Sequence, residues 1–189
     1  MEELIWGCVG FGVLYLFDFN KVKKIHPWIN SLFSVGVALL LFSSVKIFFD
    51  QPTDFSLPNN LRIVFIILAT ISALTMFYAL FGALPFKATY VSGQGNQVID
   101  TGFYALCRHP GVWAFFFTYL FLFLVSGKWM MLVATIVWTL MDIIHVWVQD
   151  RYFFPKTLHG YTEYQKKTPF LLFNKESIDR FRTTLLKGE

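Results

Sequence analysis

The sequence predicts an all-α fold, a polytopic bundle of membrane-spanning helices, and three observations support this prediction. The 189 residues are 56% hydrophobic and only 15% charged, whereas a soluble domain carries about 25% charged residues. The mean hydropathy is +0.53. The apolar residues lie in long runs instead of alternating with polar ones, which indicates helices in a bilayer rather than an unusually apolar soluble domain.

Five apolar segments are candidates for the spans, since one crossing takes about 20 residues. They are Leu4 to Phe19, Trp28 to Phe49, Leu61 to Phe86, Gly111 to Ser126 and Trp129 to Val148. The first follows an acidic start, so we interpret it as a retained transmembrane helix and not as a signal peptide. The fourth is short, and we expect it to extend back into Phe103 to Leu106, with Pro110 near its first turn.

Basic residues predict the orientation of these spans. The first loop carries Lys21, Lys23 and Lys24, and the tail from Arg151 onward carries eight Lys or Arg against four Asp or Glu. By the positive-inside rule, the first and third loops and the tail face the cytoplasm and the N-terminus lies outside. We expect an integral membrane protein in the plasma membrane of a prokaryote. The chain is then a single membrane domain, with three spans in 1–86, two spans and the polar motifs in 87–169, and a basic tail in 170–189.

The remaining composition limits the partners. The net charge of +4 comes from basic residues at the membrane borders and in the tail, so it indicates a lipid bilayer as partner and not a nucleic acid. Cys8 and Cys107 offer no disulfide framework and no metal site. The tail predicts either a basic amphipathic helix on anionic lipid or a solvated terminus. Gly7, Gly10 and Gly12 predict close helix packing, within the chain or in a homodimer.

The fifth span contains ionisable residues. Asp142, His145 and Gln149 are spaced i, i+3 and i+7 and therefore share one helical face. Such residues in a span face a protein interior or a wet cavity and indicate function by default. The alternative is an Asp142–His145 pair that only joins helices.

Two polar blocks lie on the predicted cytoplasmic side, "NQVIDTGFYALCRHPGV" and "QDRYFFPKTLHGYTEYQKKTP". Together they resemble the membrane methyltransferases of the isoprenylcysteine carboxyl methyltransferase and phospholipid methyltransferase group, over roughly Asn96 to Pro169. That family has a stretch T-x-G-x-Y-x-x-x-R-H-P-x-Y, then E-E-x-x-L, Y-x-x-Y and a proline. The residues that match in register are Gly102, Tyr104, Arg108, His109, Pro110, Tyr161, Tyr164 and Pro169. Gln149-Asp150 falls on the glutamate pair.

The resemblance implies S-adenosyl-L-methionine as the cofactor and a small or lipophilic methyl acceptor. The cofactor-binding positions implied or matched are Asn96, Gln97, Val98, Ile99, Gly102, Tyr104, His109, Pro110, Gly111, Val112, Gln149, Tyr161 and Tyr164. Arg108 and His109 are expected to cap the cofactor pocket. His145, helped by Asp142 and Asp150, is expected to orient or deprotonate the acceptor.

Three departures from the family pattern keep other functions open. Gln149 replaces a glutamate, Val112 replaces a tyrosine, and His145 replaces an arginine whose bidentate fork suits a carboxylate. One alternative is a membrane reductase that uses NADPH, of the sterol reductase type, although the third loop offers only Lys87 and Arg108 as cations for the cofactor phosphates. The other alternative is a non-catalytic membrane protein on the same scaffold. Arg108 would then be only a topology anchor.

Overall fold

The computed structural model describes residues 1–82 and 98–186, and within these ranges the chain is helical, without strands. The α-helices are α1 (Glu2–Lys23), α2 (Leu32–Asp50), α3 (Asn59–Phe77), α4 (Phe103–Leu106), α5 (Pro110–Ser126), α6 (Trp129–Val148), α7 (Phe154–Thr157), α8 (Tyr161–Lys167) and α9 (Lys175–Leu186). A 3₁₀ turn (Pro27–Ser31) precedes α2, and π-helical turns follow α3 (Tyr78–Gly82) and α6 (Gln149–Phe153). The all-α prediction is confirmed for the described residues.

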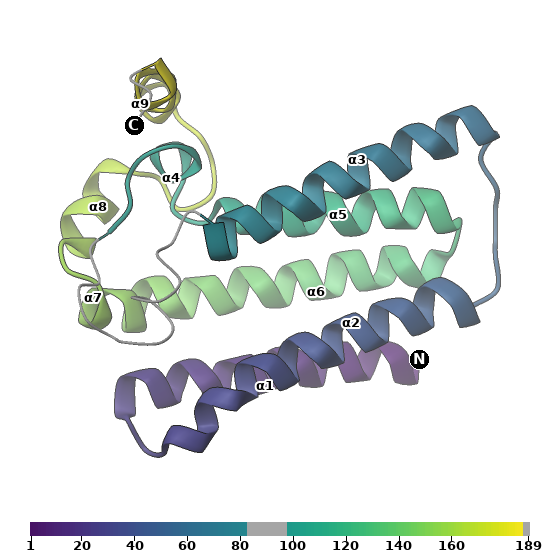
Figure 1. Ribbon diagram of the computed structural model, residues 1–189, viewed down its shortest axis with the longest axis horizontal. Helices are drawn as coiled ribbons and strands as arrows, with labels where there is room; N and C mark the ends of the chain where they lie inside the picture. Colours follow the sequence, from purple (N-terminus) through teal and green to yellow (C-terminus); the bar gives the residue numbers. More distant parts are fainter. Residues whose placement is uncertain (83–97, 187–189) are drawn as a thin grey trace.

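The long helices α1, α2, α3, α5 and α6 lie side by side, and the short helices α4, α7, α8 and α9 gather at one end of the bundle (Figure 1). We call this the polar end. Helix α1 packs on α2, α3 on α5, and α5 on α6. The C-terminal end of α1, the start of α5 and the end of α6 all lie at the polar end. The two polar sequence blocks are therefore on the same side of the bundle, as predicted.

Three helical segments are long and apolar enough to cross a bilayer, namely Pro27–Asp50, Asn59–Leu80 and Trp129–Thr157, and Pro110–Ser126 is a shorter apolar helix. Their outward faces are apolar: Ile67, Leu74 and Leu140 are all more than half exposed. Helix α1 is not among these segments, and it carries Asp18 and Asn20 in buried positions. The structure therefore supports a membrane protein with three spans by length and composition.

Two of the α1 glycines are used for packing within the chain. A Cβ on Gly7 would overlap the ring of Trp138, which is fully buried. A Cβ on Gly10 would lie 2.9 Å from the carbonyl oxygen of Gly36 on α2. Close approach of α1 to both α6 and α2 therefore requires glycine at these positions. Gly12, by contrast, has open space around it.

The opposite end of the bundle is closed by the loop between α2 and α3. The backbone N–H groups of Asp54 and Phe55 donate to the carbonyl of Gly127, at 2.8 and 3.1 Å. The carboxylate of Asp54 accepts from the N–H of Trp129 at 2.7 Å, so it caps the start of α6. The loop thus ties the first half of the chain to the α5–α6 turn.

The fourth apolar segment differs from the prediction. Phe103 to Leu106 forms a separate short helix, and Cys107 is extended before α5 starts at Pro110. A residue before proline is disfavoured in the helical conformation, and His109 has φ −128° and ψ 64°. The predicted continuous helix is therefore wrong, whereas Pro110 in the first turn is confirmed. The end of the third predicted segment, beyond residue 82, lies outside the described residues.

Candidate functional site

A buried ion pair between Arg108 and Asp150 joins the two polar sequence blocks. Nε of Arg108 donates to Oδ1 of Asp150 at 2.7 Å, and Nη2 donates to Oδ2 at 2.9 Å. The two side chains are only 11% and 9% exposed. The guanidinium and the carboxylate thus meet edge to edge in the bidentate geometry that makes the strongest charge-assisted hydrogen bonds.

The Asp150 carboxylate is also held by residues of α8 and by His109. Tyr161 Oη donates to Oδ1 at 2.6 Å, and Gln165 Nε2 donates to Oδ2 at 3.1 Å and to the Asp150 carbonyl at 2.8 Å. His109 Nε2 lies 3.2 Å from Oδ1. We call Arg108, His109, Asp150, Tyr161 and Gln165 the Asp150 network. Such a buried charge is tolerated because its remaining oxygen lone pairs are satisfied.

Arg108 also anchors the chain that follows α8. Its Nη1 donates to the carbonyls of Gln165 and Thr168, at 3.1 and 2.6 Å, and its backbone N–H donates to the carbonyl of Pro169 at 2.9 Å. The guanidinium carbon lies 5.6 Å from the ring centre of Phe170. Arg108 is therefore fully engaged in holding two blocks of the chain together.

Burial keeps the neighbours of this ion pair uncharged. It raises the pKa of the Tyr161 and Tyr164 hydroxyls, and the Asp150 carboxylate raises that of Tyr161 further. It also raises the pKa of the Cys107 thiol to about 11. Burial lowers the pKa of His109 even though Asp150 acts in the opposite direction. At neutral pH, His109 is therefore a neutral ring that donates to Asp150, and Cys107 is not a nucleophile.

Gln149 and Asp150 lie in the π-helical turn at the end of α6, and their side chains bond to different partners. Gln149 Nε2 donates to Oδ2 of Asp18 on α1 at 2.6 Å, and His145 Nε2 lies 2.6 Å from the same oxygen. The ring of Tyr15 packs on His145 with centres 4.6 Å apart. We call Tyr15, Asp18, His145 and Gln149 the Asp18 cluster. His145 and Gln149 share a face, as their spacing predicts.

Asp18 is a candidate site residue that the sequence reasoning missed. Its contact with His145 spans 127 residues, and the predicted first span ended at the neighbouring Phe19. One signal in the sequence could have identified it: Asp18 is an ionisable residue at the end of an apolar run. It also lies three residues after Tyr15, on the same face of the helix. His145 pairs with Asp18, and no hydrogen bond joins it to Asp142, so the alternative of an Asp142–His145 pair is not found.

Asp142 has an unusual position. It accepts no hydrogen bond from any described residue. It is partly accessible, although Trp138, Thr139 and His145 on the same face of α6 are buried. The carboxylate therefore borders space that its neighbours do not fill.

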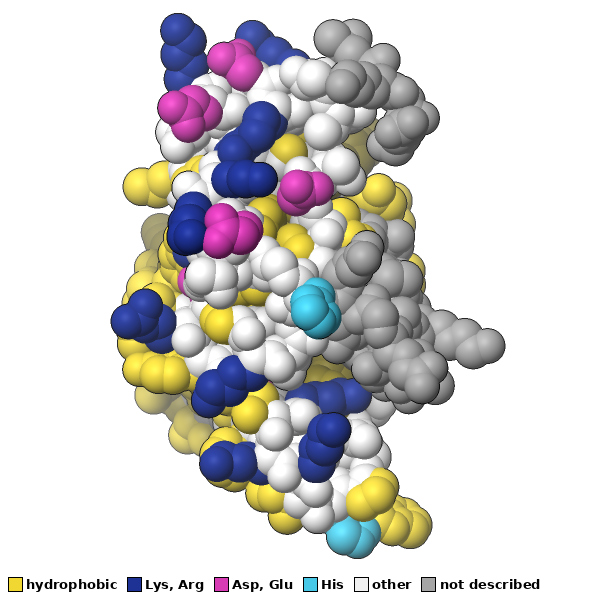
Figure 2. Space-filling model, turned by 90° about the vertical axis from the view of Figure 1, so that its left-hand side faces the viewer, with side chains coloured by type: hydrophobic (Ala, Val, Ile, Leu, Met, Phe, Trp, Pro, Cys, Tyr) yellow, Lys and Arg dark blue, Asp and Glu magenta, His cyan; other side chains and the backbone are white. Residues whose placement is uncertain are grey.

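A polar cavity of about 390 Å³ lies at the polar end, beside α8. Its lining residues are Val98, Asp100, His159, Gly160, Glu163, Tyr164 and Lys167. Lys and Arg side chains are spread over this end of the molecule (Figure 2), and Lys156, Lys166 and Lys167 are exposed there. The volume falls in the range of about 300–1,000 Å³ that is typical of small-molecule sites.

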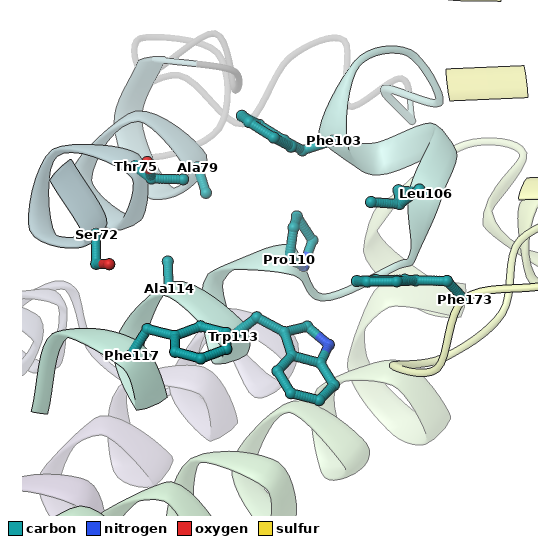
Figure 3. Close-up of a pocket in the computed structure, with 10 residues that line it drawn as sticks. All are labelled: Ser72, Thr75, Ala79, Phe103, Leu106, Pro110, Trp113, Ala114, Phe117 and Phe173. Carbon is teal, nitrogen blue, oxygen red and sulfur yellow. The ribbon is translucent and has the colours of Figure 1, made fainter. Parts of the chain in front are cut away.

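An apolar cavity of about 200 Å³ lies between α3, α4 and α5 (Figure 3). Its lining residues are Ser72, Thr75, Ala79, Phe103, Leu106, Pro110, Trp113, Ala114, Phe117 and Phe173. Phe173 is held there because Trp113 Nε1 donates to the nearby Leu171 carbonyl at 3.0 Å.

Helix α4 lines the apolar cavity and is hydrogen-bonded to a residue that lines the polar one. Phe103 and Leu106 line the apolar cavity, and the Tyr104 carbonyl accepts from Tyr164, which lines the polar cavity, at 2.7 Å. The Tyr104 hydroxyl donates to the Ala79 carbonyl at 2.7 Å. A single turn of helix thus connects the walls of the polar and the apolar cavity.

The structure distributes the predicted cofactor-binding residues over several places. Val98 and Tyr164 line the polar cavity, and Pro110 lines the apolar one. Gly102 donates its N–H to Thr184 of α9 at 3.2 Å, and Val112 is buried in α5. Ile99 follows Val98, Gly111 borders open space, and Tyr161 and His109 belong to the Asp150 network. Asn96 and Gln97 lie outside the described residues.

The sequence did not predict the cavity residues Asp100, His159, Glu163 and Lys167. They come from α8, from the residues just before it and from a segment far from it in the sequence, and spacing alone does not reveal which distant side chains meet. Among the described residues, no group of three or more His, Cys, Asp or Glu could hold a metal ion. Comparison with known proteins finds no matching family model, no matching curated protein and no matching solved structure. The function therefore has to be argued from the geometry of the site.

Proposed function

We propose that the protein transfers a methyl group from S-adenosyl-L-methionine to a small or lipophilic acceptor at the membrane surface. The observation that carries the proposal is the Arg108–Asp150 ion pair. The two blocks that resemble the membrane methyltransferases are 42 residues apart at this contact, and they meet in one buried network. If the two sequence matches were coincidental, there would be no reason for the two blocks to meet in this contact.

The chemistry of the polar cavity fits the proposed cofactor. S-adenosyl-L-methionine carries a sulfonium, an ammonium, a carboxylate and ribose hydroxyls. Asp100 and Glu163 offer carboxylates for the hydroxyls and the cationic groups, and Lys167 offers an ammonium for the carboxylate. Val98, which the resemblance assigns to the cofactor, and Tyr164, a matched motif position predicted to bind it, both line this cavity.

The apolar cavity is the proposed place for the acceptor. It is lined mainly by aromatic and aliphatic side chains, with Phe103, Trp113 and Phe173 around it (Figure 3). A lipophilic molecule would reach it sideways from the bilayer, between α3 and α5, while a water-soluble cofactor would reach the polar cavity from the aqueous side. Helix α4 then holds the two partners in a fixed relation, since it lines the apolar cavity and accepts a hydrogen bond from Tyr164 in the wall of the polar one.

The bound cofactor supplies an electrophilic methyl group, and the protein orients the two reactants and excludes water from them. In an in-line displacement the enzyme contributes mainly by orienting the reactants and excluding water. Arg108 and Asp150 act as positioning residues in this proposal, because their hydrogen bonds are already made to the chain. Their task is to fix α8, which carries Tyr164 and Lys167, against α4 and α6.

Calorimetric titration of the detergent-purified protein tests this proposal. We expect micromolar binding of S-adenosyl-L-methionine and none of NADPH. The Asp100→Asn variant should bind the cofactor at least about tenfold more weakly, because it loses one charge-assisted hydrogen bond in the polar cavity. Asp179→Asn, on the exposed face of α9, is the matched control. Folded protein that binds neither molecule would overturn the proposal, and binding of NADPH alone would favour a reductase.

We also propose five spans, with α1 and α5 completing the three long apolar helices, the N-terminus outside and the polar end in the cytoplasm. The support is that the five helices lie side by side along one direction (Figure 1) and that Lys and Arg are spread over the polar end (Figure 2). In a protein without Cys8 and Cys107, we expect a membrane-impermeant maleimide to label Asn59→Cys in intact cells. Lys166→Cys should react only after the membrane is opened. The reverse pattern would invert the topology.

A further inference from the structure

Several polar groups between α1 and α6 have no hydrogen-bond partner in the described part of the chain. The Tyr15 hydroxyl and the Thr139 hydroxyl are buried and have no hydrogen-bond partner. Asp142 accepts from no described residue. Buried polar groups are nearly always satisfied, so three unsatisfied oxygen-bearing groups in one region require an explanation.

These three groups are neighbours. Thr139 and Asp142 are spaced i and i+3 on the buried face of α6. Tyr15 reaches this face from α1, where its ring lies against His145, and Asp142 is within electrostatic range of both Tyr15 and His145. Neither of the two hydroxyls donates to the Asp142 carboxylate, although both could. A single bridging group that donates to all three oxygens would satisfy them.

The charge of the region identifies the sign of that group. Asp18 and Asp142 are both carboxylates, and neither forms an ion pair with a Lys or Arg of the described chain. With both carboxylates ionised, the region carries a net negative charge, because His145 supplies at most one positive charge. An uncompensated negative charge inside a helix bundle is costly. The bridging group is therefore cationic.

The surroundings identify its chemical class. Aromatic rings gather in this region: Phe11 lies edge-on to His145 and Tyr15 lies tilted against it. Phe115 packs between Phe11 and Tyr119. Aromatic faces stabilise organic ammonium groups, whereas a metal ion such as Ca²⁺ needs six or more oxygen ligands. We propose that Tyr15, Thr139 and Asp142 form a binding site for the ammonium group of an organic amine. This ammonium site is separate from both cavities and does not depend on methyl transfer.

Calorimetry in phosphatidylcholine nanodiscs tests the site, with n-hexylammonium chloride as the probe. We expect saturable binding of one molecule per chain, and none for hexanol or hexanoate of the same chain length. Asp142→Asn should weaken binding at least about tenfold, because it removes the charge that pairs with the ammonium. Asp50→Asn, at the other end of the bundle, should bind like the wild type. Circular dichroism checks that each variant is folded.

A second variant keeps the test informative if Asp142→Asn does not fold. Tyr15→Phe removes only a hydroxyl that has no partner, so it should fold normally and still bind hexylammonium several-fold more weakly. Equal binding by wild type and both variants, or no binding by the wild type, would refute the site. Displacement by NaCl but not by choline chloride of equal ionic strength would assign the site to an inorganic cation and overturn the organic class. Loss of S-adenosyl-L-methionine binding alone would leave the ammonium site standing.

Discussion

Replacement of Asp150 with Asn is expected to lower the free energy of unfolding by about 3–5 kcal/mol. The substitution keeps the size of the side chain but removes its charge, so Arg108 stays buried without a counterion. The new amide nitrogen also faces donors, because Tyr161, Gln165 and Arg108 all donate to the carboxylate. Chemical denaturation in detergent micelles, followed by far-ultraviolet circular dichroism, measures the change.

Asp50→Asn is the matched control for this variant. Asp50 pairs with Lys46 one helical turn away, but both side chains are more than two-fifths exposed. Exposed pairs of this kind contribute about 0–1 kcal/mol. A second control is the Arg108→Met, Asp150→Leu double variant, which leaves no unpaired charge and should cost less than the sum of the two single changes. If Asp150→Asn is no more harmful than Asp50→Asn, the Asp150 network does not stabilise the polar end.

The sequence was sufficient to predict the parts of the fold that depend on local patterns. Runs of apolar residues predict helices in a bilayer, and Pro110 predicts the start of α5. A break just before Pro110 was predictable too, because the residue before a proline, here His109, avoids the helical conformation. The extension of the fourth helix through Phe103 to Leu106 overlooked this rule, and the structure has two separate helices there.

The candidate site was less predictable, because its contacts join distant segments. The spacing of His145 and Gln149 correctly places them on one face, but it cannot reveal that Asp18 of α1 is their partner. Gln149 and Asp150 are consecutive, and both were aligned with the glutamate pair of the family motif. The π-helical turn places one in the Asp18 cluster and the other in the Asp150 network. Such turns are rare, often mark functional sites, and have no reliable sequence signal.

Gly127→Ala is expected to destabilise the protein by about 2–4 kcal/mol, through two effects that add. Gly127 has φ +66°, a left-handed conformation that costs any residue with a Cβ about 1 kcal/mol or more. The new Cβ would also overlap the backbone carbonyl of Phe55. A backbone group cannot rotate away as a side chain can, so overpacking adds about 1–3 kcal/mol.

The loop must move to relieve that overlap, and its hydrogen bonds are lost with it. The Asp54 and Phe55 N–H groups bond to the Gly127 carbonyl, and the Asp54 carboxylate caps α6 at Trp129. The loss should appear as a lower midpoint of thermal unfolding and as faster proteolysis between α2 and α3. Gly12→Ala is the matched control, since its Cβ meets nothing within 4 Å and alanine in a helix is more stable than glycine by up to about 1 kcal/mol. Equal midpoints for the two variants would mean that the loop does not dock on the α5–α6 turn. Helix α6, which carries Asp142 and His145, would then be held in place by its packing on α1, α2 and α5.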